Sequence, residues 1–338
     1  MYILISHVGH YSQDTLEDLI GKDVFDVLDS LEKYLVKVSS EDNSLVRESA
    51  VYSIQSGGKR FRPLLLFTIY KFLGGQDFNS IIPLAAAIEM VHTATLIHDD
   101  IIDGATLRRG KSSIVSKYGL TEAIISGDFL FVKAFELATL YKSDIGRVLA
   151  KSCRYVADGE LMEEKLRNKI DMSMEEYIKI VEMKTAMPIA AVSKSAVMYL
   201  DYPEEVVDSM EKFGIGLGIA FQIKDDILDY FGNEKNLGKS LYTDLRRGNH
   251  TIISIIAKNG LDDTEKKRFL ELFKKSNKTE EDMDYLLSTL KTGEIEKKAM
   301  DIAKGYVYEA IEQLHVVKNE EFRKTLEEIS NKIITRES

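Results

Sequence analysis

The stretch IPLAAAIEMVHTATLIHDDIID, residues 82–103, indicates the fold most directly. Residues 84–98 are apolar on nearly every side of a helix, which is typical of a helix buried at the centre of a bundle. A second apolar stretch, residues 213–223, also runs into a group of aspartates. Carboxylates are rarely buried without a partner, so the end of each apolar helix is a candidate functional site.

The remaining sequence predicts further helices and no sheet. Prolines are few, at four in 338 residues, and apolar residues recur at helical spacing. No alternating run bounded by turn residues indicates a strand. We expect helices at about 14–38, 44–56, 61–73, 81–103, 120–142, 144–168, 173–200, 204–231, 249–258, 263–275, 280–290, 293–316 and 319–335. The prediction is an all-α protein with one domain over residues 1–338, a motif-bearing core at about 44–258 and C-terminal helices at about 260–336.

Charge and composition exclude several classes of protein. The formal net charge of −10 is unfavourable for binding nucleic acid, because neutralising its phosphates needs many Lys and Arg side chains. An uncharged apolar run long enough to cross a bilayer is missing, so no transmembrane segment is predicted. The single cysteine, Cys153, cannot form an internal disulfide. We therefore expect a soluble protein of the cytoplasm.

Two aspartate runs have the same spacing, DDIID at 99–103 and DDILD at 225–229. The first and last aspartates of each run lie one helical turn apart and share a face, where like charges repel unless a cation lies between them. Magnesium accepts a few carboxylates, keeps waters and is completed by substrate phosphates. The candidate metal ligands are Asp99, Asp100, Asp103, Asp225 and Asp229.

Basic residues occur beside these runs. The segments are GGKRFRP at 57–63, RRGK at 108–111, Lys184-Thr185 and Lys239. Arginine can hold phosphate oxygens in a fork and lysine acts as a point charge. A Walker A loop is absent, and Gly214, Gly216 and Gly218 lie in a helical context that favours close helix packing. Together with the aspartates, these segments predict a site for metal-bound diphosphate.

At this point the sequence resembles the head-to-tail trans-prenyl diphosphate synthases. The resemblance covers roughly residues 50–250. It rests on GGKRFRP, HTATLIHDDIIDGATLRRGK, GDFL, KT, FQIKDDILD, and GK before TDLRRG. It implies one large bundle of long, mostly antiparallel helices around a deep central cavity, usually in a homodimer. The implied reaction condenses isopentenyl diphosphate with an allylic diphosphate, with several Mg²⁺ ions in each active site.

The resemblance also implies roles for individual residues. Asp99, Asp103 and Asp225 would bind magnesium, with Asp100 and Asp229 close by and Asp226 and Asp244 in support. Isopentenyl diphosphate would be held by Lys59, Arg62, His92 and Arg109. The allylic diphosphate would be held by Arg108, Lys184, Thr185, Gln222 and Lys239. One departure lies in the family's D-L-x-x-G segment, where Asn249 follows Gly248 in place of a lysine; Arg247 or His250 is a candidate substitute.

Chain length is expected to depend on the helix before Asp99. In the family an aromatic residue near Ala94 and Thr95 closes a short cavity, and Ala94 leaves it open. Val91, Met90 and Ala87 are then candidate floors. This predicts a product longer than farnesyl diphosphate, either a long-chain polyprenyl diphosphate or geranylgeranyl diphosphate. For the second product the floor would be Met90, or Phe129 or Phe131.

Three other interpretations stay open from the sequence. Glu89-x-x-His92 and Glu312-x-x-His315 have the spacing found in helical di-iron proteins. A class I terpene cyclase shares one aspartate motif and the magnesium chemistry, but carries a different second metal motif. A non-catalytic partner subunit of a heteromeric synthase tends to lose the aspartates, which are intact in this chain.

Overall fold

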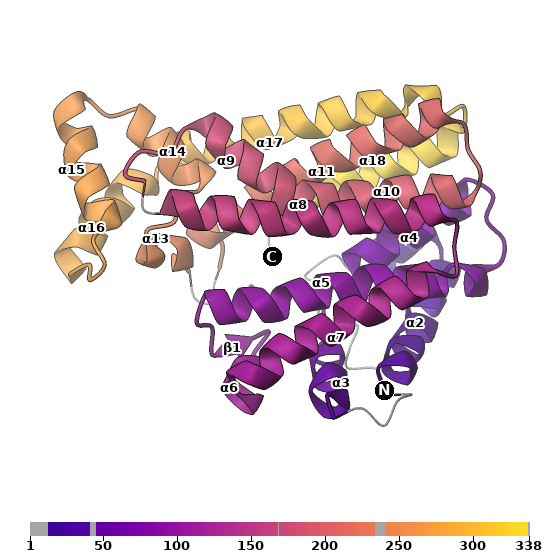
Figure 1. The fold of residues 1–338 in the computed structure, drawn as a ribbon. Coiled ribbons are helices and arrows are strands. Elements are labelled where there is room, and N and C mark those ends of the chain that lie inside the picture. The colour runs from indigo at the N-terminus through magenta and orange to yellow at the C-terminus, as the bar shows by residue number, and fades with distance from the viewer. Residues whose placement is uncertain (1–12, 41–44, 168, 234–240, 337–338) are drawn as a thin grey trace. The chain divides into compact units, whose positions relative to one another are not determined.

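The computed structural model describes residues 13–40, 45–167, 169–233 and 241–336 (Figure 1). Nearly all of these residues are helical, and the two strands among them have two residues each. The prediction of an all-α protein is therefore confirmed. None of the helices in these ranges is both long and apolar enough to cross a membrane.

The chain forms two compact units. Unit 1 comprises residues 1–153, 191–208 and 319–325, and unit 2 comprises residues 154–190, 209–318 and 326–338. The single domain predicted over residues 1–338 stays a prediction. The aspartates at 99–103 belong to unit 1, whereas those at 225–229 belong to unit 2.

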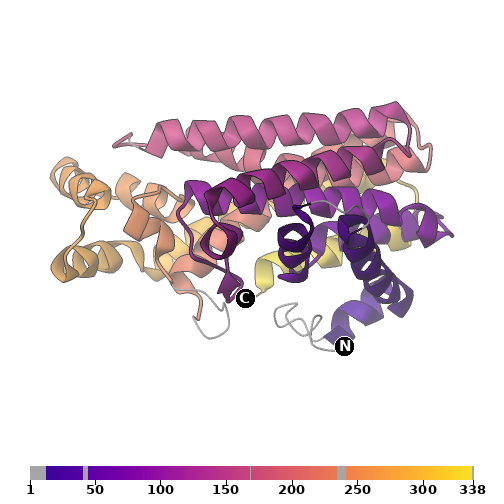
Figure 2. The ribbon, with the colours of Figure 1, turned by 60° about the horizontal axis from the view of Figure 1, so that its bottom comes forward.

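Unit 1 is built around α5. Its helices are α1 (Gln13–Ile20), α2 (Lys22–Ser40), α3 (Arg47–Gln55), α4 (Phe61–Phe72), α5 (Ile82–Ile102), α6 (Ile114–Tyr118) and α7 (Leu120–Ala138), with the 3-10 turn η1 (Phe78–Ser80). Helix α5 packs mainly against α7 and also against α2 and α4, and the pair α5 and α7 lies side by side in Figures 1 and 2. Residues 84–88 of α5 are all buried, as their apolar character predicts.

Two local predictions for unit 1 were wrong. The helix expected over 14–38 is divided at Gly21, whose φ of 91° lies in the left-handed region. The missing sheet is also a correction, because strands β1 (Leu107–Arg108) and β2 (Lys111–Ser112) form an antiparallel ribbon. Arg109 and Gly110, the two residues of its turn, both have positive φ, as the tight turn of a two-residue hairpin requires.

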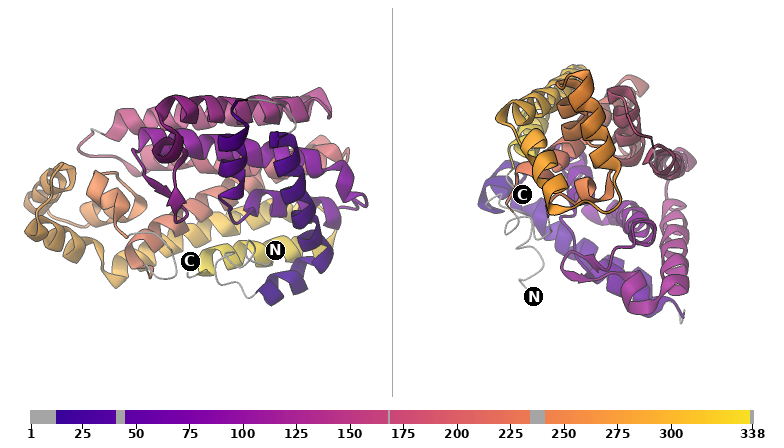
Figure 3. Two further views of the ribbon diagram at one scale, coloured as in Figure 1. Left: turned by 90° about the horizontal axis from the view of Figure 1, so that it is seen from below. Right: turned by 90° about the vertical axis from the view of Figure 1, so that its left-hand side faces the viewer.

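Unit 2 carries most of the C-terminal half of the chain. Its elements are the end of α8 (Ser143–Arg167), α9 (Met174–Val181), the π-helical turn η2 (Glu182–Ala186), the start of α10 (Met187–Tyr199), all but the first turn of α11 (Glu204–Phe231), α13 (Thr243–Arg247), α14 (Ile252–Asn259), α15 (Asp263–Lys274), α16 (Glu280–Leu290), α17 (Gly293–Gln313), η3 (Leu314–Val316) and the end of α18 (Glu320–Thr335). Helix α14 packs on α15, α16 and α17, and Figure 3 shows the orange pair α15 and α16 side by side.

Helix α11 reaches its neighbours closely through glycines. A Cβ at Gly214 would lie 2.5 Å from the Cα of Ala190, and one at Gly218 would lie 2.4 Å from the Cα of Ala186. Real side chains do not approach a backbone this closely, so only glycine allows this contact. The interpretation of these glycines as packing residues, and not as a dinucleotide loop, is confirmed. The close packing also holds α11 against the segment that carries Lys184 and Thr185.

Candidate active-site residues in the two units

The first aspartate run lies at the C-terminal end of α5. Asp103 directly follows the helix and its N–H donates to the carbonyl of Asp99 at 2.8 Å. Asp99 and Asp103 are partly exposed, whereas Asp100 is buried and accepts a hydrogen bond of 2.9 Å from Nε of Arg108, with a second contact from Nη2. The first and last aspartates are therefore accessible to solvent, whereas the middle one is covered by the protein.

Several arginines lie near His92, which is about two helical turns before Asp99. Burial lowers the pKa of His92 well below its usual value, and the nearby Arg62, Arg109, Arg60 and Arg108 lower it further. The imidazole is thus neutral at neutral pH and has one nitrogen that can donate and one that can accept a hydrogen bond. Loss of hydration also lowers the pKa of Arg109, with its neighbouring arginines adding to that shift. This concentration of positive charge is suited to an anion.

Arg60, one of the arginines near His92, connects several helices. Its side chain is buried and pairs with Glu89 on α5 at 2.6 Å and with Glu32 on α2, and it also donates to the carbonyl of Ile54. These contacts connect α2, the loop before α4 and α5. Because Glu89 is paired with Arg60, it does not support the di-iron interpretation. Glu312 and His315 form an exposed pair, 3.3 Å apart, and give no support either.

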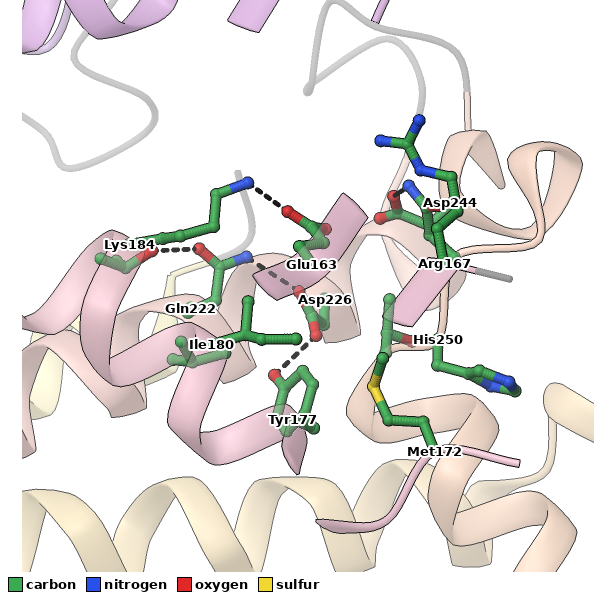
Figure 4. Close-up of a pocket in the computed structure, with 14 residues that line it drawn as sticks. Glu163, Arg167, Met172, Tyr177, Ile180, Lys184, Gln222, Asp226, Asp244 and His250 are labelled. Carbon is green, nitrogen blue, oxygen red and sulfur yellow. Dashed lines mark hydrogen bonds and ion pairs between the residues drawn. The ribbon is translucent and has the colours of Figure 1, made fainter. Parts of the chain in front are cut away.

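Unit 2 contains a pocket of about 130 Å³ (Figure 4). It is lined by residues of α8, α9, η2, α11 and the segment around α13. Five residues predicted from the sequence line it together: Lys184, Thr185, Gln222, Asp226 and Asp244. Residues separated by up to 60 positions in the sequence are thus brought to one cavity. Lys239 lies outside the described residues.

Asp226 is held by a chain of hydrogen bonds in this pocket (Figure 4). Thr185 Oγ1 donates to Gln222 Oε1 at 2.9 Å, and Gln222 Nε2 donates to Asp226 Oδ1 at 2.9 Å. The Tyr177 hydroxyl donates to Asp226 Oδ2 at 2.7 Å. Burial raises the pKa of Asp226 to about 7, and the nearby carboxylates of Asp244 and Asp225 add to the rise. Asp225, by contrast, is 41% exposed.

Lys184 is positioned by the π-helical turn between α9 and α10. The N–H of Met187 bonds to the carbonyl of Glu182, five residues earlier, so the turn is one residue wider than in an α-helix. The ammonium of Lys184 contacts Glu160 at 2.5 Å and also Glu163, both on α8. These carboxylates raise its pKa against the effect of burial. Lys184 is therefore a fully charged group held by two acids at the pocket.

Asn249 and His250 occupy the segment where the family pattern has a lysine. The Nδ2 of Asn249 lies 3.5 Å from Oδ1 of Asp244, and its Oδ1 is buried with no hydrogen-bond partner within the described residues. His250 stacks on Phe273 and contacts the carbonyl of Ile170 at 3.0 Å. Burial lowers the pKa of His250 to about 4. The neutral His250 does not supply the missing positive charge.

With this geometry in place, the comparison with protein families can be stated. The sequence model of the polyprenyl synthetase family matches residues 43–290. The chain belongs to the polyprenyl synthetase family. This confirms the resemblance drawn from the motifs and, with it, prenyl transfer as the class of function.

Individual members of the polyprenyl synthetase family are similar over most of the chain. The short chain isoprenyl diphosphate synthase of Methanocaldococcus jannaschii is 36% identical over 78% of this chain and 82% of its own. The geranylgeranyl diphosphate synthase of Saccharolobus solfataricus is 34% identical over 80% and 84%. The crystal structure of a Caulobacter crescentus polyprenyl synthase complexed with calcium and isoprenyl diphosphate has a TM-score of 0.85, with 29% identity over 96% of this chain and 98% of its own. The all-helical isoprenoid synthase fold is thereby confirmed.

For a polyprenyl synthetase, the residues before Asp99 are of interest for chain length. Met90 and Ala94 are fully buried, whereas Val91 and Thr95 are partly exposed. Thr95 lies one turn before Asp99 and Val91 one turn earlier still, so these two share the face of Asp99. Of the four predicted chain-length residues, Val91 and Thr95 thus lie on the aspartate face.

Sequence reasoning missed several residues of this polyprenyl synthetase. They are Tyr177, Glu160, Glu163, Arg60 and Arg336. Tyr177 and the two glutamates lie on ordinary amphipathic helices, where nothing in the spacing separates them from surface residues. Arg60 stands inside GGKRFRP, and its left-handed φ of 46° at the start of α4 is a feature that the sequence does not reveal.

Proposed function

We propose that the protein is a magnesium-dependent prenyl diphosphate synthase that condenses isopentenyl diphosphate with an allylic diphosphate and releases diphosphate. The observation that carries the proposal is the presence of two sets of cations with aspartates beside them, one in each unit. Unit 1 has the arginines around His92, and unit 2 has Lys184 and Arg167 in its pocket. An enzyme that joins two diphosphates must hold two anions, whereas a cyclase holds one.

The aspartates provide the kind of ligand that magnesium binds. Every candidate ligand is a carboxylate oxygen, which is the donor that magnesium prefers. In unit 2 burial raises the pKa of Asp226 and the nearby carboxylates of Asp244 and Asp225 raise it further, and a bound cation would relieve that repulsion. Among the described residues no three His, Cys, Asp or Glu side chains form a metal site by themselves. Sites that are completed by waters and phosphate oxygens do not need a third carboxylate.

Asp99 and Asp103 would hold magnesium in unit 1, and Asp225 would hold it in unit 2 with Asp229. Bound magnesium would supply positive charge against the oxygens of the leaving diphosphate. The remaining residues stabilise the same charge as hydrogen-bond donors and fixed cations. Lys184, Thr185, Gln222, Lys239 and Arg108 would bind the allylic diphosphate. Lys59, Arg62, His92 and Arg109 would bind isopentenyl diphosphate, with neutral His92 donating a hydrogen bond.

With the two diphosphates held in this way, the proposed reaction proceeds in three bond changes. The allylic C–O bond breaks and its electron pair leaves with diphosphate. The double bond of isopentenyl diphosphate then forms the new C–C bond to the allylic cation. Loss of a proton from the resulting cation restores a double bond, and the released diphosphate accepts that proton. Apolar walls around the allylic chain would exclude water, which would otherwise capture the cation.

We propose a product longer than farnesyl diphosphate. Ala94, Val91 and Thr95 are all small and none carries the aromatic ring that closes a short cavity in the family. Geranylgeranyl diphosphate and longer polyprenyl diphosphates both agree with this proposal. The similar proteins support both, since they include geranylgeranyl and heptaprenyl diphosphate synthases.

We also propose a homodimer in the cytoplasm. Helix α7 exposes several large apolar side chains, namely Leu120, Ile124, Ile125 and Val132. A second copy of the chain would cover such a face, as exposed apolar groups of this kind commonly mark an interface. Light scattering after size-exclusion chromatography would give twice the mass of one chain. A monomeric mass at micromolar concentration would refute this part of the proposal.

The test of function is an elongation assay. The purified protein is incubated with radiolabelled isopentenyl diphosphate, Mg²⁺ and geranyl, farnesyl or geranylgeranyl diphosphate, and the dephosphorylated products are separated by length. We expect labelled alcohols beyond farnesol, and a loss of at least about a hundredfold in Asp99→Ala. Wild-type turnover in Asp99→Ala would reject the metal assignment. No incorporation by the folded protein with any starter would reject the proposed function.

A further inference from the structure

Arg336, directly after α18, is bonded to the second aspartate run. Its Nη2 donates to Oδ1 of Asp225 and lies 3.4 Å from the carbonyl of Phe221. The guanidinium carbon lies 4.2 Å from the centre of the Phe221 ring, in a cation–π contact. All three groups belong to unit 2. The residue that follows α18 is thus attached to α11 at a carboxylate that the proposed function assigns to magnesium.

The side chain of Arg336 is buried, although that of its partner is not. Its side chain is 5% exposed, whereas that of its partner Asp225 is 41% exposed. Its Nε is buried and has no hydrogen-bond partner within the described residues. An unsatisfied buried donor costs stability, and a buried ion pair is weak evidence that the pair stabilises the fold. The arrangement therefore calls for a reason other than stability.

The contacts of Arg336 restrict how Asp225 can move. Ring stacking and the Phe221 carbonyl fix the plane of the guanidinium, and the guanidinium in turn holds Oδ1 of Asp225. Phe221 lies one helical turn before Asp225, so both contacts are on one side of α11. Carboxylates that bind metals are commonly held by such outer hydrogen bonds, and loss of one typically weakens metal binding by about 10- to 100-fold.

We propose that Arg336 is a positioning residue that orients the carboxylate of Asp225 for magnesium. This inference rests on the proposed function, because it takes Asp225 as a metal ligand. It gives a functional role to the residue after α18, a region that lies outside the sequence motifs. The inference also opposes a second possibility, that Arg336 acts as a competing cation. In that case its removal would strengthen metal binding, so the two possibilities predict opposite signs.

The experiment measures metal binding directly, with Mn²⁺ as the probe. Free Mn²⁺ is followed by electron paramagnetic resonance during titration of the full-length protein in the presence of inorganic diphosphate. The variants are Arg336→Gln, Arg336→Lys, Asp225→Asn and the double variant. Lys324→Gln is the matched control, because Lys324 lies on the same helix and forms only an exposed pair with Glu320. Thermal melting shows whether each variant is folded.

We expect Arg336→Gln to weaken the Asp225-dependent Mn²⁺ binding by about tenfold or more. Arg336→Lys restores the charge but not the planar fork, so we expect partial recovery. Arg336→Gln should add nothing in the Asp225→Asn background, since it acts through that carboxylate. Unchanged or tighter binding in folded Arg336→Gln, or a full additional loss in the double variant, would overturn the inference. If Arg336→Gln does not fold, the same comparison is made with Arg336→Lys.

The wild-type titration separates this inference from the proposed function. No saturable Mn²⁺ binding by wild type with diphosphate present would contradict the metal site itself. Saturable binding by wild type that is the same in the folded Arg336 variants would contradict only the inference about Arg336. Lys324→Gln should match wild type in either case.

Discussion

Tyr177 on α9 donates a 2.7 Å hydrogen bond to Oδ2 of the buried Asp226 on α11. This bond stabilises the ionised carboxylate and so lowers the pKa of Asp226, against the larger effect of burial. In Tyr177→Phe the pKa of Asp226 should therefore rise, and the acidic limb of the pH–activity profile should move to higher pH. The free energy of unfolding should fall by about 1 kcal/mol. An acidic limb at the wild-type position would show that ionised Asp226 is not needed. Tyr308→Phe, at an exposed position of α17, is the control.

Asp226 should also make the stability of the metal-free protein depend on pH. A carboxyl with a pKa of about 7 in the folded state and about 4 in the unfolded state favours folding when it is protonated. Its contribution is complete below about pH 4 and is lost as the pH rises to about 7, with a total of up to about 4 kcal/mol. Urea unfolding with EDTA should show this decline in wild type and a smaller one in Asp226→Asn. If the free energy of unfolding changed with pH equally in the two proteins, the raised pKa of Asp226 would be contradicted.

Glu163 should compete with the allylic diphosphate for Lys184. Because Lys184 is paired with Glu163 and Glu160, a phosphate must replace or share these contacts. Glu163→Gln should lower the KM for the allylic diphosphate several-fold, with a smaller change in the KM for isopentenyl diphosphate. Steady-state kinetics measure both values. Glu294→Gln, which changes an exposed pair with Lys298, is the matched control. A raised KM in Glu163→Gln would mean that the glutamate positions Lys184 for binding.

Asn249→Lys should strengthen binding of the allylic diphosphate. The new ammonium would lie at the pocket beside Asp244, where the neutral His250 supplies no charge. One added charge-assisted hydrogen bond is worth about tenfold in affinity. Isothermal titration with a non-reactive allylic analogue measures the change. Asn331→Lys adds the same charge at an exposed position and should have no effect. Equal affinities for wild type and Asn249→Lys would show that a lysine at this position does not reach the substrate.

A larger residue on the aspartate face of α5 should shorten the product. Val91→Phe places a ring on the face of Asp99, two turns before it, so the main product should lose at least one isoprene unit. Ala94→Tyr should also shorten it, but Ala94 is fully buried and the variant should lose about 1–3 kcal/mol of stability by overpacking. Product chromatography and thermal melting measure these effects. Val316→Phe, at an exposed position of η3, is the control. An unchanged product in Val91→Phe would exclude this face as the floor.

Much of this protein could be predicted from its sequence because the deciding signals are local. The apolar stretches at 84–98 and 213–223 predict buried helices, and the aspartates that follow them indicate the candidate sites. Interruptions of a helix that depend on the backbone angles of one residue were harder to predict from the sequence. Gly21 divides a helix that periodicity alone joins, and the ribbon at 107–112 is too short for an alternating pattern.

The partners of the predicted site residues were harder to predict, since they depend on tertiary contacts. Lys184 was expected to bind phosphate, but its pairing with Glu160 and Glu163 requires the register of α8 against η2. Likewise, His250 follows Gly248 closely enough to suggest a substitute cation. Its stacking on Phe273 and its contact with Ile170 are formed by segments far away in the sequence. Residue type and spacing therefore identify the candidates, but not which of them is already engaged.

The wide turn at Glu182–Ala186 has a consequence for how this region can change in evolution. An α-helix advances by about 100° per residue, so removing one residue here would restore regular hydrogen bonding and rotate α10 relative to α9 by that angle. Either Tyr177 would then lose its contact with Asp226, or Ala186 and Ala190 would lose their contacts with α11. We therefore expect no insertions or deletions within residues 182–186 of related sequences. A sequence alignment that opens a gap there would misplace Lys184 and Thr185 together.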